Sequence, residues 1–110
     1  MQPFLSRIIL TACLVICSTG ALAETQMGLG NQNCRTWIAN PASGGGLGLL
    51  YQQWIFGFLS GVSFADPDHD PLKDMDVGTV MTWLNKYCQD SPPEVRLEDA
   101  AIAFIRAHHP

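Results

Sequence analysis

The sequence predicts an all-α fold, a small four-helix bundle stapled by one disulfide bond. Apolar residues recur at helical spacing along much of the chain, and no segment shows the alternation typical of a strand. Cys34 and Cys88 lie 54 positions apart and are the two cysteines that remain once an apparent export signal is set aside. Together these observations indicate a stapled helical domain outside the cytoplasm.

The first 23 residues have the order of an export signal. Arg7 precedes an apolar run over residues 8–17, and Ala21 and Ala23 are the small residues that signal peptidase needs before its cut. The apolar run is too short for a membrane anchor, which needs about 20 residues. We therefore expect residues 1–23 to be cleaved with two further cysteines, which leaves residues 24–110 as a single small helical domain.

This mature domain is expected to depend on its disulfide bond. Residues 24–110 form one core at most, and a domain of this size has little stability to spare. An exported chain with two cysteines normally oxidises them to each other. A bridge between Cys34 and Cys88 would stabilise the fold by about 4 kcal/mol through its constraint on the unfolded chain.

The charge of the mature domain limits its partners. Ten Asp and Glu against five Lys and Arg give −5, and an acidic surface without a basic patch repels nucleic acid and anionic lipid. No charge occurs between Thr36 and Ala65. The glutamines, serines and helical periodicity of that stretch favour a buried helix over a membrane span. We therefore expect no nucleic acid partner and no membrane association of the mature form.

The first two helices follow from caps and periodicity. We expect one helix from Asn31, as its cap, to Ile38, and then a flexible link from Ala42 to Gly48. A second helix begins at Leu47. Its predicted apolar face consists of Leu50, Tyr51, Trp54, Ile55, Phe58, Leu59 and Val62.

Two more helices follow an acidic loop over residues 66–71. Asp76 is expected to cap the third helix. Ser91-Pro92-Pro93 should end it and lead into the last helix. The early turns of that helix are expected to contain Glu94, Glu98 and Asp99. The predicted core face of the third helix consists of Val77, Val80, Met81, Leu84 and Cys88.

No group of residues predicts catalysis, a cofactor or a metal site. The histidines lie in the acidic loop and at the tail, away from any nucleophile on a rigid element. The acidic loop offers alternating carboxylates to calcium, but Pro71 and Val77 stand where an EF-hand needs Gly and Glu. The glycine-rich stretch 44–48 lacks the strand and the Lys-Ser or Lys-Thr of a phosphate loop. We therefore expect a protein that is not an enzyme and has no cofactor.

The second helix carries the candidate interaction features. Gly57 and Gly61 are one turn apart, and we expect them to allow close packing within the bundle. Phe56 and Phe64 lie off the main apolar face, and we expect another helix to cover them. If they were exposed, they would form a dimer face or a client-binding patch. The expected core anchors are Trp37, Trp54 and Trp83.

Several of these features resemble one known family. Cys34-Arg35-Thr36-Trp37-Ile38 before Asn40-Pro41, an aromatic-rich helix, and Tyr87-Cys88 followed by Pro92 are similar to the HdeA/HdeB family of periplasmic acid-stress chaperones. The resemblance covers most of residues 31–105. It implies an HdeA/HdeB-like fold in the periplasm, a Cys34–Cys88 bridge, and a homodimer near neutral pH. It also implies that strong acid loosens the fold, and that the loosened protein then binds unfolding proteins through its apolar surface. The candidate residues for binding a client or partner are Trp54, Phe56, Phe58 and Phe64.

The titration of the chain agrees with this expectation. Below about pH 3 most carboxylates are protonated, and five Lys and Arg with three His then give +8 in place of −5. Such a swing would loosen a marginal bundle, while the bridge limits how far it opens. The sequence therefore predicts an acid-activated holdase for unfolded periplasmic proteins.

A second interpretation is a periplasmic immunity or adaptor protein with one dedicated protein partner. Residues 54–61 and Glu98-Asp99-Ala100-Ala101 are similar to the two main helices of small disulfide-containing proteins that neutralise type VI secretion toxins. One tight partner at neutral pH favours this interpretation, and many weak partners in acid favour the chaperone. A bridge-stabilised structural protein without a ligand is a third interpretation.

Overall fold

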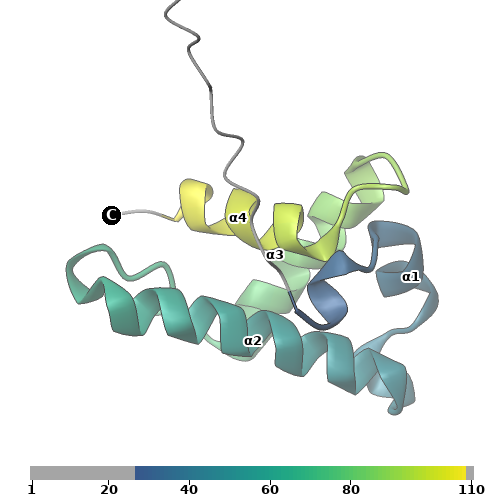
Figure 1. The fold of residues 1–110 in the computed structure, drawn as a ribbon, viewed down its shortest axis with the longest axis horizontal. Coiled ribbons are helices and arrows are strands. Elements are labelled where there is room, and N and C mark those ends of the chain that lie inside the picture. Colours follow the sequence, from purple (N-terminus) through teal and green to yellow (C-terminus); the bar gives the residue numbers. More distant parts are fainter. Residues whose placement is uncertain (1–26, 109–110) are drawn as a thin grey trace, which may run out of the picture.

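The computed structural model describes residues 27–108, and the predicted signal peptide with its cleavage site lies outside them. Four helices lie within the described residues: α1 (Cys34–Ala39), α2 (Leu47–Ala65), α3 (Val77–Asp90) and α4 (Leu97–Ala107). Short 3₁₀ turns lie at Leu29–Asn31, Ala42–Gly44 and Pro67–His69. Figure 1 shows α4 running alongside the long α2, with α3 behind them and α1 at one end. The prediction of an all-α fold with four helices is confirmed.

The cap of helix α1 lies two residues later than the sequence predicts. Asn33, and not Asn31, is the cap, because its Oδ1 accepts the backbone N–H of Thr36 at 3.1 Å. A cap at Asn31 would need the N–H of Cys34, which instead donates to the carbonyl of Val95 at 2.7 Å. Asn31 and Asn33 are both suitable capping residues, and the long-range backbone bond of Cys34 favours the cap at Asn33.

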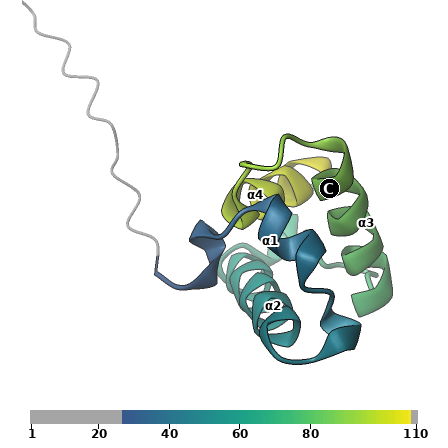
Figure 2. The same ribbon diagram turned by 90° about the vertical axis from the view of Figure 1, so that its right-hand side faces the viewer.

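Helix α2 buries a narrower stripe than its sequence predicts. Tyr51, Ile55 and Leu59 are buried at i, i+4 and i+8, and they form the α2 side of the core. Leu50 was expected on the same face, but 55% of it is exposed. Figure 2, which views the bundle along α2, shows the N-terminal segment against this helix. That segment reaches Trp54 and leaves Leu50 uncovered.

Helices α3 and α4 complete the core. Val80, Leu84 and Cys88 are buried on α3, and α4 contributes Leu97, Ala100, Ala101 and Phe104. Asp76 caps α3 as predicted, with its Oδ1 accepting the N–H of Thr79 at 2.7 Å. Val77 was expected on the core face but is 53% exposed, because it lies in the first turn beyond the packed region. Helix α4 begins at Leu97, so Glu94 precedes the helix instead of lying in an early turn.

The predicted flexible link at residues 42–48 is partly structured. A 3₁₀ turn forms at Ala42–Gly44, Gly45 and Gly46 take positive φ, and α2 then begins at Leu47. Gly48 is buried inside the first turn of α2, and a Cβ there would collide with the carbonyl oxygens of Asn40 and Pro41. This glycine therefore serves close packing between the start of α2 and the end of α1.

The N-terminal strap, residues 27–31, lies across the bundle. Its 3₁₀ turn contacts both α2 and α4, Leu29 packs against the core, and Gly30 is buried. None of the helices within residues 27–108 is long and apolar enough to cross a membrane.

Candidate protein-binding surfaces

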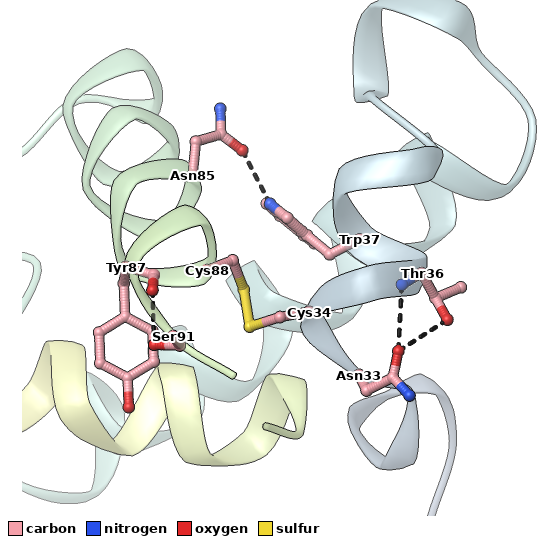
Figure 3. The surroundings of a disulfide bond; sticks show 8 residues. All are labelled: Asn33, Cys34, Thr36, Trp37, Asn85, Tyr87, Cys88 and Ser91. Atoms are coloured by element: carbon pink, nitrogen blue, oxygen red, sulfur yellow. Dashed lines mark hydrogen bonds between the residues drawn. A yellow bond between two sulfur atoms is a disulfide. The ribbon is translucent and has the colours of Figure 1, made fainter. Parts of the chain in front are cut away.

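The disulfide bond joins the start of α1 to the last turn of α3. Cys34 and Cys88 are bonded, and both are buried. Figure 3 shows the bridge beside Trp37, whose indole Nε1 donates to Oδ1 of Asn85 on α3 at 2.7 Å. Trp37 is only 4% exposed, so its expected role as a core anchor is confirmed. The predicted bridge is confirmed as well, and it fixes α1 on the C-terminal half of α3.

Backbone hydrogen bonds attach the segment before α4 to the same place. The N–H of Leu97 donates to the carbonyl of Gln32 at 2.8 Å, which complements the bond from Cys34 to Val95. These two bonds pair the backbones of Asn33 and Arg96 in an isolated antiparallel β-bridge. The Arg96 side chain lies 3.3 Å from both Glu98 and Asp99. Glu98 is 5% exposed and is a buried carboxylate of the core. Three chain segments therefore meet around the disulfide bond.

Carboxylates order the connection that leads into the opposite end of α3. The connection between α2 and α3, residues 66–76, contains five Asp and one Lys. Asp70 accepts the backbone N–H of Leu72 at 2.8 Å, and Asp76 caps the helix. Asp74 has a positive φ of 59°, a conformation that Asp tolerates better than most residues. Pro71 is buried, so these bonds position an apolar anchor beneath an acidic surface.

Hydrogen bonding lowers the pKa of Asp70 and the pKa of Asp76. The Ser63 hydroxyl, followed by the Leu72 N–H, lowers the pKa of Asp70 from its ordinary value of 3.8. The Thr79 N–H, followed by the Thr79 hydroxyl, lowers the pKa of Asp76 in the same way. A lowered pKa means that the ionised group stabilises the fold. This contribution is complete above about pH 4 and is lost as pH falls through the lowered pKa values.

The predicted binding aromatics do not form one patch. Trp54 and Phe58 stack with ring centroids 5.3 Å apart, and both are half-buried. The Trp54 indole Nε1 donates to the carbonyl of Met27 at 3.2 Å. Gly28 has a positive φ of 92°, and a Cβ there would lie 3.2 Å from the Trp54 ring. The N-terminal strap therefore packs on Trp54, which is a half-covered residue rather than a central core anchor.

The other two aromatics lie in different surroundings. Phe56 is half-buried and packs against the core, as expected. Phe64 was also expected to be covered, but it is 90% exposed. It lies in the last turn of α2, and no helix within residues 27–108 covers it. Trp83, expected as a core anchor, is half-buried and packs edge-on against the buried Phe104.

The glycine pair of α2 does not pack inside the bundle, so that expectation was wrong. Nothing lies within 4 Å of a Cβ added at Gly57 or at Gly61. Both residues are on the solvent side of α2, where the apolar stripe of the helix does not reach.

A cleft of about 330 Å³ was not predicted from the sequence. It lies between α1, the turn after α1, and α3. Its lining includes Trp37, Ile38, Pro41, Met81, Asn85 and Gln89. The sequence does not indicate this cleft, because Asn and Gln on an exposed helix face usually contact only water.

Residues 27–108 contain no group of three or more His, Cys, Asp or Glu side chains placed to hold a metal ion. His69, in the acidic connection, lies 3.0 Å from Asp66, and both side chains are about half exposed.

Comparison with known proteins identified no matching family model, no matching curated protein and no matching solved structure.

Proposed function

We propose that this protein is an acid-activated holdase of the periplasm, which binds unfolding proteins at low pH. The observation that carries the proposal is the difference between the two ends of α3. One end is bonded covalently to α1 through Cys88. At the other end the carboxylate of Asp76 caps the helix, and the carboxylate of Asp70 orders the connection that leads into it. Acid acts on these carboxylates and leaves the disulfide bond intact.

The direction of the pH effect follows from the lowered pKa values of these two aspartates. Protonation replaces a charged acceptor by a weaker neutral one and removes a negative charge from the N-terminus of α3, where the helix dipole favours it. Five aspartates close together also repel one another, and acid relieves that repulsion. The lowered pKa values of Asp70 and Asp76 mean that hydrogen bonding outweighs repulsion at these two positions, so acid weakens this end of α3.

Release of this end would uncover apolar surface. Val80 and Leu84 of α3 are 1% exposed, and Ile55 and Leu59 of α2 are fully buried. The disulfide bond keeps α1 on α3, so the chain opens without separating. Such a partly open state offers an apolar surface to a client, as a holdase requires.

The test is light scattering from an acid-labile periplasmic client that is shifted from pH 7 to about pH 2–3, where carboxylates titrate. The oxidised chain 24–110 should suppress scattering only in acid. The double variant Asp70→Asn/Asp76→Asn keeps capping side chains that do not titrate, so its opening, followed by dye binding to apolar surface, should move to lower pH. Asp68→Asn is the matched control, because Asp68 makes no hydrogen bond or ion pair within residues 27–108. The proposal fails if acid gives no suppression, or if the double variant opens at the same pH as the control.

A second candidate function is an immunity or adaptor protein with one dedicated partner at neutral pH. The observation that favours it is apolar surface already uncovered in the folded state: Phe64 at one end of α2, and Leu47, Leu49 and Leu50 at the other. A single tight partner at pH 7, together with no client protection in acid, would support this function over the holdase.

A further inference from the structure

The cleft between α1 and α3 is open in the folded protein. We propose that it binds an extended, uncharged peptide segment of a partner protein at neutral pH. The site does not depend on acid opening, because it is present in the folded state with the disulfide bond and the caps intact.

The lining of the cleft is polar but uncharged. Its side chains include the amides of Asn40, Asn85 and Gln89 and the hydroxyl of Ser43, and no Asp, Glu, Lys, Arg or His is among them. A charged ligand would find no counter-charge here, and burying a charge without a partner is costly. Carboxamides both donate and accept hydrogen bonds, which matches the alternating N–H and C=O groups of a peptide backbone.

The hydrogen bond from Trp37 orients one of these amides. Oδ1 of Asn85 accepts the indole N–H at 2.7 Å, and Figure 3 shows the Nδ2 group turned away from Trp37. No partner for this Nδ2 lies within residues 27–108. Gln89 is one helical turn further along α3 and is exposed. Side chains four apart on a helix are about 5–6 Å apart, and groups on one side of an extended peptide recur about every 6.6 Å. The two amides therefore suit two successive groups of one strand.

The remaining walls suit an aliphatic side chain of the same segment. Ile38, 49% exposed, and Pro41 line one side, and the half-buried, adaptable Met81 lines the other. The volume of about 330 Å³ is at the small end of the range for ligand pockets, which suits a short segment and not a folded partner. A neutral sugar fits less well, because Trp37 is 4% exposed and offers no open ring face for stacking.

The test is two-dimensional NMR of the oxidised chain 24–110 at pH 7. The reporters are the side-chain amides of Asn85 and Gln89 and the indole N–H of Trp37. The probe is an equimolar library of end-blocked hexapeptides made from Ala, Ser, Thr, Asn, Val, Leu and Pro. A second library with Lys and Glu at alternate positions and the neutral sugar maltohexaose are the comparison probes. We expect saturable shifts of the three reporters with the neutral library, and weaker or no shifts with the other two probes.

Variants link these shifts to the cleft. Ser43→Trp places a bulky ring at its edge and should weaken binding at least ten-fold, whereas Ser60→Trp, the same change on the exposed side of α2, should not. Gln89→Ala should weaken binding about five-fold, the equivalent of one hydrogen bond of about 1 kcal/mol, and Gln53→Ala on α2 is its control. The proposal is overturned if the neutral library leaves the reporters unmoved, if maltohexaose or the charged library shifts them more, or if Ser43→Trp binds as well as Ser60→Trp. Because the test is at pH 7, failure here leaves the acid-activated function to its own test.

Discussion

Reduction of the Cys34–Cys88 bond should remove a large share of the stability of this fold. The bond closes a loop between residues that are 54 positions apart. In the chain-entropy model such a loop lowers the entropy of the unfolded chain by about 14 cal/mol/K, which is about 4 kcal/mol at 25 °C. Small domains are stable by only about 5–15 kcal/mol in total. The reduced protein is therefore expected to be marginally folded at pH 7.

The assay is urea unfolding followed by tryptophan fluorescence, on the oxidised and the reduced chain at pH 7. Fluorescence reports the core, because Trp37 is buried next to the bond. The double variant Cys34→Ala/Cys88→Ala is the control, since reductant should not change its unfolding curve. In acid, the oxidised chain should open only in part, whereas the reduced chain should unfold completely. A stability difference below about 1 kcal/mol between oxidised and reduced protein would refute the chain-entropy argument.

Three further predictions concern packing and capping, and thermal or urea unfolding checks each of them. Leu59→Ala should destabilise the fold by about 2–5 kcal/mol, because the side chain is fully buried in the core; a loss below 1 kcal/mol would mean that the site is not closely packed. Asn33→Ala should cost about 1 kcal/mol through loss of the α1 cap, whereas Asn31→Ala, at the position that the sequence favoured, should change stability little. Gly48→Ala should destabilise the fold despite the higher helix propensity of Ala, because the new Cβ would collide with backbone carbonyls; a more stable variant would contradict that packing.

Local patterns predicted most of the helical structure. Asp76 as the α3 cap and Leu47 as the start of α2 follow from rules that act within a few residues. The start of α1 does not, because the Cys34 N–H is taken by Val95, which is 61 positions away in the chain. The later start of α4 has the same cause, because the N–H of Leu97 donates to the distant carbonyl of Gln32 and not to a carbonyl in a preceding helical turn.

The candidate surfaces were harder to predict than the fold. Helical periodicity identifies an apolar face but not how far its neighbours extend, so Leu50 and Phe64 were expected to be covered and are exposed. The N-terminal strap over Trp54 depends on a carbonyl at Met27, which has no side-chain signal. The cleft is formed by Asn85 and Gln89, which look like ordinary solvent-facing residues until α1 is placed opposite them.

The disulfide bond makes residues 34–88 a closed covalent ring, with α2 and the acidic connection inside it and α4 outside. A single proteolytic cut in the acidic connection would therefore add one water to the mass of the protein and release no fragment. A single cut within residues 91–96 would free α4, and with it the buried Phe104. A cut in this short segment therefore has a larger effect than a cut inside the ring, and the hydrogen bonds from Cys34 and Leu97 hold the segment against the body of the fold.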